Sequence, residues 1–414
     1  MSAAGPAAAR AATDADAILG VRPKEVFAPA TVAEAADALA EKARARASVG
    51  FIGGGTSLAL GRPPRKLDAV IRTERLDRIV EHAPSDQIVV VEAGLTLGAL
   101  QRAVAARGQR LALDPPLTDR RTVGGLVATN AFGPRRTRYG TLRDLVIGIS
   151  LVRADGIIAR GGGKVVKNVA GFDLPKMMIG SLGTLGLVAT VTFRLHPLPE
   201  TGVTLVARSR TARGVRELLA AMRDAQLEPA ATAALSGEEG FDLGLRFEGF
   251  EEGVKEQVGR TLALAAKGAA PCETLSVAEE RAFWERHDAV RTGGPLRAKA
   301  ALLPSAFEEF SESVLPKLRD VLSGLALAVY PTLGICFFSG LPSDVASAVA
   351  AIASARSLAA AAGGSLVLEE APDGVRALVD PWGAPPSSFP LMRSLKERLD
   401  PGSRLNPGRF VGGI

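Results

Sequence analysis

The chain is poor in the residues that hold metals and metal clusters. Its 414 residues include two cysteines, Cys272 and Cys336, and three histidines, His82, His196 and His287. An iron–sulfur cluster normally takes four thiolates, so this chain cannot hold one alone. The histidines show no metal-binding spacing such as H-x-x-x-H. We therefore interpret both cysteines as reduced core thiols and expect no bound metal.

The chain also lacks a long apolar run and a strong excess of charge. No segment approaches the ~18 to 20 apolar residues that a membrane span requires. The first segment, MSAAGPAAARAATDADAI, has neither a basic start nor a leucine-rich stretch, so it predicts a loose tail rather than a signal peptide. These features predict a cytoplasmic protein, with membrane association through partner proteins as the alternative.

The net charge of +6 is modest for this length. Two basic runs, residues 62–66 and 135–138, lie beside glycine turns and lack interleaved aromatic residues. This arrangement argues against nucleic-acid binding and favours a small anionic ligand. The length itself predicts two or three domains.

Glycine is abundant, and it gathers in turns that follow strands. Residues 48–52 read as a short buried strand that runs into Gly53, Gly54 and Gly55, followed by Thr56 and Ser57. Bare backbone can approach a ligand closely, and the two hydroxyl groups suit phosphate oxygens. The turn is not a Walker A loop, because no Gly-Lys-Ser/Thr follows it. It is a candidate anion cradle.

A second cradle candidate is the turn GSLGTLG, with Gly180, Gly183 and Gly186 at every third position. Successive N–H groups there can approach a phosphate without a Cβ in the way. Residues 187–195 alternate as a strand after it, whereas a dinucleotide fingerprint opens a helix, so this order argues against a Rossmann fold. The alternative interpretation is a tight turn before a core strand.

Between these turns, residues 122–133 form a stretch of small residues that exposes Thr129 and Asn130. A planar ligand can lie on such a surface. The alternative is close helix packing through small side chains.

The coarse pattern predicts an α+β protein. Thr31 and Glu34 form a capping box before a helix that ends near Arg46, and Asp155-Gly156 is a strong hairpin signal. Residues 202–370 read twice as strand, helix, strand, strand, helix, which predicts one antiparallel sheet with helices on a single face. The first half is predicted at 203–208, 212–225, 231–236, 241–247 and 251–267, and the second at 296–302, 304–320, 325–330, 333–339 and 342–361. A last strand at 365–369 closes the second half, and a helix at 278–290, which carries Trp284, is expected to bridge the halves. A C-terminal helix is predicted near 391–399.

Taken together, the three glycine-rich turns resemble the vanillyl-alcohol-oxidase type of FAD-binding domain, also called the PCMH type. Within that superfamily, KNVAGFDL before GSLGTLG, TVGGLVATN followed by RTRYG, and the closing LDPGSRLNPGR resemble the FAD-binding E subunits of bacterial glycolate oxidases. The resemblance covers nearly the whole chain. It implies a PCMH-type FAD-binding domain of two α+β subdomains and an antiparallel-sheet cap domain. The boundaries it implies are a tail at 1–22, the FAD domain at 23–199, the cap at 200–370 and a C-terminal segment at 371–414 that returns to the FAD domain.

The resemblance also implies which residues hold FAD. The first glycine turn and the GSLGTLG turn are expected to cradle the pyrophosphate, and the middle stretch is expected to lie along the isoalloxazine. The implied FAD-binding residues are Gly53, Gly54, Gly55, Thr56, Ser57, Leu58, Pro116, Thr122, Gly124, Gly125, Thr129, Asn130, Gly133, Gly180, Ser181, Gly183, Thr184, Gly186, Leu187 and Asn406.

The chain departs in two ways from the proteins that it resembles. No His or Cys occupies the turns through which some members attach FAD covalently, so we expect non-covalent FAD. The H-x-G-D-G-N-x-H segment that supplies metal and proton-abstraction ligands in related 2-hydroxy-acid dehydrogenases is also missing. The catalytic base is therefore not identified. Arg138 and Tyr139 are candidates near the flavin, where a guanidinium can pair with a small carboxylate; the alternatives for Arg138 are a solvated charge or a contact to the ribityl or phosphate groups.

Two functions of different class follow. The first is the FAD-binding subunit of a glycolate or 2-hydroxy-acid oxidase complex, which passes electrons to a second flavoprotein subunit and an iron–sulfur subunit. The second is a non-catalytic flavin-binding assembly or electron-transfer subunit. A free-standing FAD oxidase of another hydroxy substrate is a further alternative.

Overall fold

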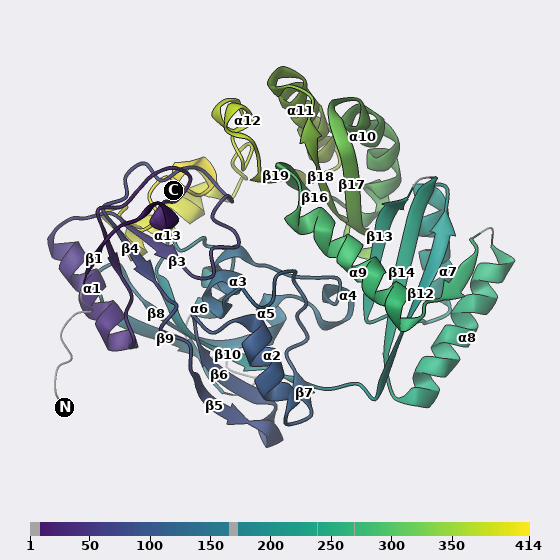
Figure 1. Cartoon of the computed structure of the whole chain (residues 1–414), viewed down its shortest axis with the longest axis horizontal. Helices are drawn as coiled ribbons and strands as arrows, with labels where there is room; N and C mark the ends of the chain where they lie inside the picture. The colour runs from purple at the N-terminus through teal and green to yellow at the C-terminus, as the bar shows by residue number, and fades with distance from the viewer. Residues whose placement is uncertain (1–8, 165–172, 238, 269) are drawn as a thin grey trace. The chain divides into compact units, whose positions relative to one another are not determined.

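The computed structural model describes residues 9–164, 173–237, 239–268 and 270–414 (Figure 1). Most of the KNVAGFDL motif, residues 167–172, lies outside these ranges. The described residues divide into two compact units. Unit 1 contains residues 9–132, 140–198 and 384–414, and unit 2 contains residues 133–139 and 199–383.

Unit 1 is built on two sheets. The first has four strands in the order β1-β2-β4-β3, in which β2 and β3 run parallel to β4. The second has five antiparallel strands in the order β5-β6-β10-β8-β9. The strands of the two sheets are β1 (Arg10–Ala11), β2 (Glu25–Phe27), β3 (Val49–Ile52), β4 (Ala69–Arg72), β5 (Ile79–Ala83), β6 (Ile88–Glu92), β8 (Val146–Val152), β9 (Ile158–Gly162) and β10 (Leu187–Arg194), and a separate pair joins β7 (Gln109–Arg110) to β11 (His196–Pro197).

The turn between β8 and β9 confirms the Asp155-Gly156 hairpin signal. Gly156 adopts a φ of +85°, a conformation that an L residue rarely takes. The Asp155 carboxylate accepts a hydrogen bond from the Ile157 N–H at 3.1 Å. The strands then pair from Val152 with Ile158 onward.

The helices of unit 1 are short, and most begin at a Thr or Asp N-cap. They are α1 (Val32–Arg44), α2 (Leu97–Ala105), α3 (Val123–Thr129), α5 (Leu142–Leu145), α6 (Leu174–Met178) and α13 (Phe389–Leu399). Thr31 caps α1 as predicted, because its Oγ1 accepts from the Glu34 N–H at 3.1 Å. The Glu34 carboxylate, however, accepts from the Ala30 N–H one residue before the cap. Ala35 and Leu39 of α1 are fully buried in a core shared with Val152.

Unit 2 contains the predicted duplicated sheet. Its eight antiparallel strands have the order β15-β12-β14-β13-β17-β18-β16-β19, so each strand-helix-strand-strand-helix half occupies one side. The strands are β12 (Thr201–Ser209), β13 (Ala231–Gly237), β14 (Gly240–Gly249), β15 (Cys272–Thr274), β16 (Leu296–Ala301), β17 (Leu322–Tyr330), β18 (Ile335–Pro342) and β19 (Ser365–Glu370). The halves meet where Ala234 and Leu235 of β13 pair with Val329 and Ala328 of β17.

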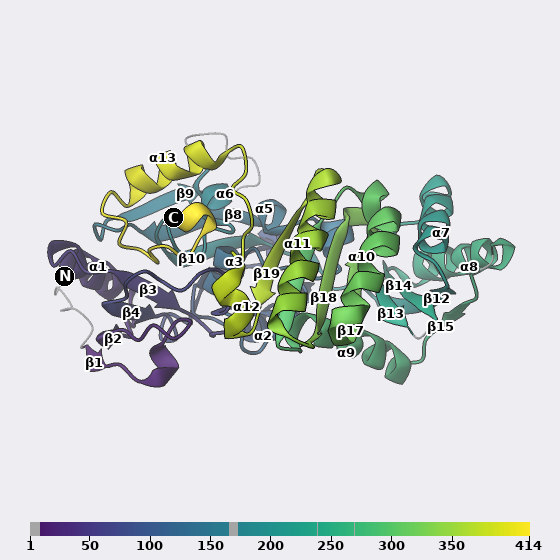
Figure 2. The ribbon, with the colours of Figure 1, turned by 90° about the horizontal axis from the view of Figure 1, so that it is seen from above.

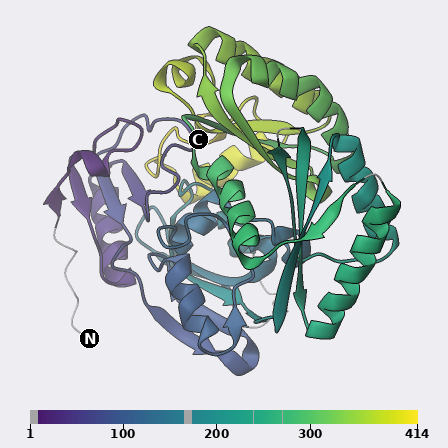
Figure 3. The same ribbon diagram turned by 45° about the vertical axis from the view of Figure 1, so that its right-hand side comes forward.

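Four helices cover one face of this sheet, and a fifth lies on the other (Figure 3). The covering helices are α7 (Ala212–Asp224), α8 (Glu251–Lys267), α10 (Phe307–Val321) and α11 (Val345–Ala361), and the remaining helices of unit 2 are α4 (Arg136–Tyr139), α9 (Val277–Thr292) and α12 (Asp373–Leu378). Alternate strand residues such as Leu245 and Phe338 belong to the core under α7, α8, α10 and α11. Their neighbours Gly244 and Phe337 meet α9 instead, through Phe283 and Arg291. Helix α9 contacts β13, β17 and β18, so it bridges the two halves as expected.

Residues 384–414 of the expected C-terminal segment belong to unit 1 (Figure 2), whereas residues 371–383 belong to unit 2, so the return begins later than expected. Leu405 forms a bridge with Val49 of β3, and the Asn406 N–H donates to the Val49 carbonyl at 2.9 Å. Among the described helices, none combines the length and apolar composition that crossing a bilayer needs.

Candidate flavin site

A cleft in unit 1 brings together the three glycine-rich stretches that the sequence analysis singled out. It is lined by Phe51, Gly53, Gly54, Gly55, Thr56, Ser57, Leu58, Thr122, Gly125, Ala128, Thr129, Leu182, Gly183, Asn406 and Arg409. Eleven of these are implied FAD-binding residues: Gly53 to Leu58, Thr122, Gly125, Thr129, Gly183 and Asn406. Four segments that are far apart in the sequence therefore share one concave surface.

The first glycine turn packs so closely on residues 120–122 that side chains are excluded at Gly53 and Gly54. A Cβ at Gly54 would lie 1.6 Å from the Arg120 carbonyl oxygen, and one at Gly53 would lie 2.2 Å from Thr122 Oγ1. Gly55 has a φ of +71°, which favours glycine. Arg121 supports the turn from outside the cleft, because it donates to Ser57 Oγ at 3.2 Å.

The small-residue stretch forms helix α3. One face of this helix packs closely through small residues, and the other faces the cleft, so both interpretations of the stretch apply. Thr122 is the N-cap, and its Oγ1 accepts from the Gly125 N–H at 3.3 Å. Gly124 faces β6, where an added Cβ would lie 2.9 Å from the Cβ of Ala93, so this face packs tightly. Gly125 and Thr129 face the cleft. One face thus secures the helix, and the other is available to a ligand.

The GSLGTLG turn also divides between packing and the cleft. The Gly180 and Leu182 N–H groups each donate at 2.8 Å to carbonyls of α3, those of Val127 and Ala128. A Cβ at Gly186 would lie 3.0 Å from the Val152 carbonyl, so Gly186 allows β10 to pack. Of the three glycines, Gly183 lines the cleft. Gly180 and Gly186 therefore fit the alternative interpretation, a tight turn before a core strand, whereas Gly183 fits a ligand cradle.

The C-terminal segment closes the cleft. Asn406 is buried, and its Nδ2 donates to the Leu182 carbonyl at 3.0 Å. Arg409 donates to the carbonyls of Leu58 and Leu60, each at 2.8 Å. The closing NPGR motif holds both residues, but Arg409 was not among the implied site residues. Its role becomes visible only once the chain has folded back on the first turn.

The cleft retains hydrogen-bonding capacity that a ligand can use. Of the residues that line it, Asn406 has a buried Oδ1 without a hydrogen-bond partner among the described residues, and the same holds for Ser181 Oγ and Asn130 Oδ1, which lie next to lining residues in the sequence. Asn130, Leu182 and Asn406 also adopt positive φ angles of 50°, 51° and 43°. Such backbone strain gathers at ligand sites because the surrounding structure must maintain it. The residues present therefore fit a polar ligand such as a dinucleotide.

Other implied residues lie behind the cleft or in unit 2. The Pro116 carbonyl accepts from Arg121 Nε at 3.2 Å, and Thr184 Oγ1 donates to the Ser181 carbonyl at 2.7 Å. Leu187 belongs to the core of unit 1. Gly133 falls in the segment 133–139, which is part of unit 2.

The two catalytic candidates, Arg138 and Tyr139, also lie in this segment of unit 2. Arg138 is exposed and donates from Nη1 to the Glu228 carbonyl at 3.1 Å. Its neighbour Arg135 forms an ion pair with the buried carboxylate of Glu248 at 2.7 Å. Unit 2 therefore holds the segment that follows α3 in the sequence.

Sequence reasoning noted Arg136 in the basic run 135–138 but missed two cationic residues on the α9 face of the unit 2 sheet, Arg291 and Lys299. Arg136, Arg291 and Lys299 come from α4, α9 and β16, and each is partly exposed. Burial lowers the pKa of Lys299, and repulsion from Arg291 and Arg136 lowers it further, although Glu369 opposes the shift. These residues have no shared motif or fixed spacing, so nothing in the sequence links them.

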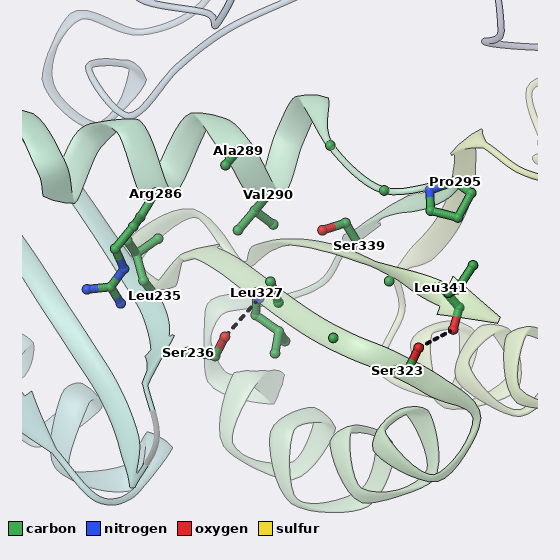
Figure 4. A pocket seen from close by; sticks show the side chains of 15 residues that line it. Leu235, Ser236, Arg286, Ala289, Val290, Pro295, Ser323, Leu327, Ser339 and Leu341 are labelled. Carbon is green, nitrogen blue, oxygen red and sulfur yellow. Dashed lines mark hydrogen bonds between the residues drawn. The ribbon is translucent and has the colours of Figure 1, made fainter. Parts of the chain in front are cut away.

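A separate cavity of about 440 Å³ lies between α9 and the strands β13, β17 and β18 (Figure 4). Its lining is mainly apolar and includes Leu235, Val290, Leu327 and Leu341. The charged side chain in that lining, Arg286, forms an ion pair with Asp242 at 3.0 Å. The cavity holds none of the implied site residues.

The two cysteines lie in strands of unit 2, and burial makes both thiols weaker acids than usual. Cys336 is buried in β18, and burial raises the pKa of its thiol to about 12. Cys272 is half-buried, and burial raises the pKa of its thiol to about 11. Within the described ranges, no group of three or more His, Cys, Asp and Glu side chains is arranged to hold a metal ion.

Comparison with known proteins shows what this chain is similar to. Residues 23–162 match the family model described as an FAD binding domain. Over 206 residues, 49% of this chain, the sequence is 34% identical to glycolate oxidase subunit GlcE of Escherichia coli (strain K12), and the match spans 56% of that protein. Over 420 aligned residues, 94% of this chain, it is 27% identical to glycolate oxidase subunit GlcD of Bacillus subtilis (strain 168), of which 89% is covered.

The fold as a whole is shared with alkyldihydroxyacetonephosphate synthase. The TM-score is 0.71 at 17% sequence identity, and the match covers 94% of this chain and 78% of that one. These findings confirm the predicted α+β fold and the predicted FAD cofactor. The predicted resemblance to the E subunit alone is not confirmed, because the match to the D subunit extends over more of the chain.

Proposed function

We propose that this FAD-dependent oxidoreductase oxidises the hydroxyl group of a small 2-hydroxy acid such as glycolate. The observation that carries the proposal is the cleft in unit 1, where the first glycine turn, α3, Gly183 and Asn406 form one surface. The FAD-binding domain match falls on two of these segments. Two proteins that match this chain over more than half of their own length are named as glycolate oxidase subunits.

In this proposal, unit 1 is the FAD-binding domain and unit 2 is the cap domain. The backbone of Gly53, Gly54, Gly55 and Gly183, where a side chain is excluded or strained, accommodates the pyrophosphate, and the hydroxyl groups of Thr56 and Ser57 are available to its oxygens. Gly125 and Thr129 of α3 lie along the ring system. When bound, FAD supplies the acceptor for the two electrons of the oxidation. The protein must bind the acid and take the hydroxyl proton.

Acid or guanidinium is expected to release all FAD from the purified chain. None of the two cysteines and three histidines lines the cleft, so no nucleophile of the usual kind is available for a covalent bond. The measurement is the flavin absorbance of the supernatant after precipitation. Flavin fluorescence that stays with the denatured chain on a gel would contradict this prediction.

Glycolate is expected to bleach the flavin of the full-length chain under anaerobic conditions if the chain itself carries out the oxidation. The measurement is the loss of flavin absorbance on mixing, with acetate as the control because it lacks the hydroxyl group. A flavin that stays oxidised until partner proteins are added would favour the second function, a flavin-binding assembly or electron-transfer subunit.

We also propose that the chain works in a complex with a second flavoprotein subunit and an iron–sulfur subunit. Reduced flavin must be reoxidised, and two cysteines are too few for a cluster. The relatives' names as subunits support this arrangement. The test is whether glycolate-to-dye activity in an extract disappears when this chain is removed. Equally fast turnover by the isolated chain with oxygen would instead indicate a free-standing oxidase.

A further inference from the structure

The cavity beside α9 opens where the two halves of the unit 2 sheet part. Strand β13 pairs with β17 at Ala234 and Leu235, and the pairing ends there. At the next position the Leu327 N–H donates to Ser236 Oγ at 3.0 Å, so a side chain takes the place of a backbone acceptor (Figure 4). The space of about 440 Å³ beyond this point lies between α9 and the diverging strands. The cavity is therefore a consequence of where the sheet pairing stops.

One polar side chain in the cavity wall has unused hydrogen-bonding capacity. Ser339 of β18 is 6% exposed, and its hydroxyl group makes no hydrogen bond to any described residue. Figure 4 shows this side chain pointing from β18 into the space beside Val290. A buried hydroxyl group costs free energy when it is left unpaired. A ligand that brings a hydrogen-bonding atom to Ser339 would remove that cost.

The walls around Ser339 favour an acceptor on the ligand. Ser236 already accepts a hydrogen bond from the Leu327 N–H, so its own O–H remains able to donate. Two serine hydroxyl groups that can donate thus line the same cavity. A carbonyl oxygen suits them, since it accepts through two lone pairs and offers no proton.

The rest of the lining favours a neutral and mainly apolar molecule. Leu235, Val290 and Leu327 supply most of the wall near Ser339. The charged side chain in the lining, Arg286, is paired with Asp242 at 3.0 Å, so its charge is compensated. A cavity of about 150 Å³ is large enough for benzene. The larger space here has room for about two fused rings with a short substituent.

We propose that this cavity binds a neutral, mainly apolar small molecule whose carbonyl oxygen accepts a hydrogen bond from Ser339. The ligand class is a ketone, ester or amide on an apolar body. The proposal is independent of the flavin cleft and of the proposed oxidation, because every residue that it uses belongs to unit 2.

The test compares three probes of one shape by equilibrium dialysis against the FAD-loaded full chain. They are 2-acetylnaphthalene, which has a carbonyl group, 2-ethylnaphthalene, which lacks the oxygen, and the anion 2-naphthoate. The ketone is expected to bind one molecule per chain, about threefold to tenfold more tightly than the hydrocarbon, because it gains one hydrogen bond. The anion is expected to bind more weakly than the ketone, since no uncompensated cation lines the cavity.

Ser339→Ala should remove the preference for the ketone and leave the affinity for the hydrocarbon unchanged. The matched control is Ser323→Ala in the same lining. The Ser323 hydroxyl group already donates to the Leu341 carbonyl at 3.3 Å, so this change should keep the preference. A merely structural role for Ser339 would alter the affinities for both probes alike.

Ala326→Phe tests the location. Ala326 of β17 is the direct cross-strand partner of Ser339, so both side chains project from one face and the added ring fills the space beside the hydroxyl group. Binding of the ketone and the hydrocarbon should both fall at least about tenfold, with normal FAD content.

Four results would overturn the proposal. The absence of saturable ketone binding, or its persistence in Ala326→Phe, would show that the cavity is not the site. A ketone preference that survives Ser339→Ala would remove the role of that hydroxyl group. Tighter binding of 2-naphthoate than of the ketone would show that the ligand is an anion.

Discussion

Substituting Gly125 by valine is expected to give a folded chain that purifies with little FAD. Gly125 lines the cleft, its φ is not in the left-handed region, and the nearest atom to an added Cβ is Thr122 Oγ1 at 3.2 Å. The added Cβ therefore requires only a small shift of the Thr122 side chain, whereas in the cleft the side chain occupies space that the proposed ligand needs. A clash of this kind costs about 1–3 kcal/mol, which corresponds to roughly 10- to 100-fold weaker binding. FAD titration of the apoprotein measures the effect.

Two comparison variants separate binding from folding. Gly183→Val should also lose FAD, but it should destabilise the chain as well. Gly183 has a φ of +69°, and an added Cβ would lie 2.7 Å from Asn406 Nδ2. Gly259→Val on the exposed side of α8, where nothing lies within 4 Å, should keep its FAD. A Gly125→Val chain with normal flavin content would show that the cleft does not hold FAD.

Asp400→Ala is expected to lower the free energy of unfolding by about 3–5 kcal/mol, because it leaves a buried ammonium group without its counter-ion. Lys396 and Asp400 pair at 2.7 Å, and their side chains are 4% and 0% exposed. Burial lowers the pKa of Lys396, and Asp400 opposes that shift. Lys396 Nζ also donates to the carbonyls of Thr184 and Leu405, and Asp400 accepts from the Leu405 N–H. The pair thus fastens the segment that carries Asn406 to the GSLGTLG turn.

Urea unfolding and FAD titration measure the effect of Asp400→Ala, and a fall in Tm of about 6–20 °C is expected for a unit of this size. The control is Glu217→Ala, which breaks an exposed pair with Arg213 at the same i,i+4 spacing. That change should cost about 1 kcal/mol or less. Adding Lys396→Met to Asp400→Ala should recover part of the loss, because the unpaired charge is then removed. Equal effects of Asp400→Ala and Glu217→Ala would refute the role of the buried pair.

Local physical chemistry made much of the fold readable in advance. The hairpin at Asp155-Gly156 depends on a glycine that can adopt a positive φ, and the helix at Val32 depends on a threonine cap. The two repeated halves of unit 2 could be predicted from the spacing of apolar residues, because apolar residues recur every second position in a strand and about every 3.6 positions in a helix. The glycine turns predicted a ligand cleft because repeated glycines after strands require close approach of the backbone.

The sequence by itself therefore determined the α+β class, the duplicated sheet and the stretches that meet at the cleft, and its resemblance to PCMH-type domains added the FAD cofactor. Only the tertiary structure decided which residues of each stretch pack against the protein and which face the cleft. Gly124 and Gly125 are neighbours of identical chemistry, yet one packs on Ala93 and the other faces the cleft, because successive residues of a helix point in different directions. Likewise, Arg291 and Lys299 meet only because β16 pairs with β18 in one register and α9 crosses that face. Contacts of this kind depend on the pairing of distant segments, which residue spacing along the chain does not encode.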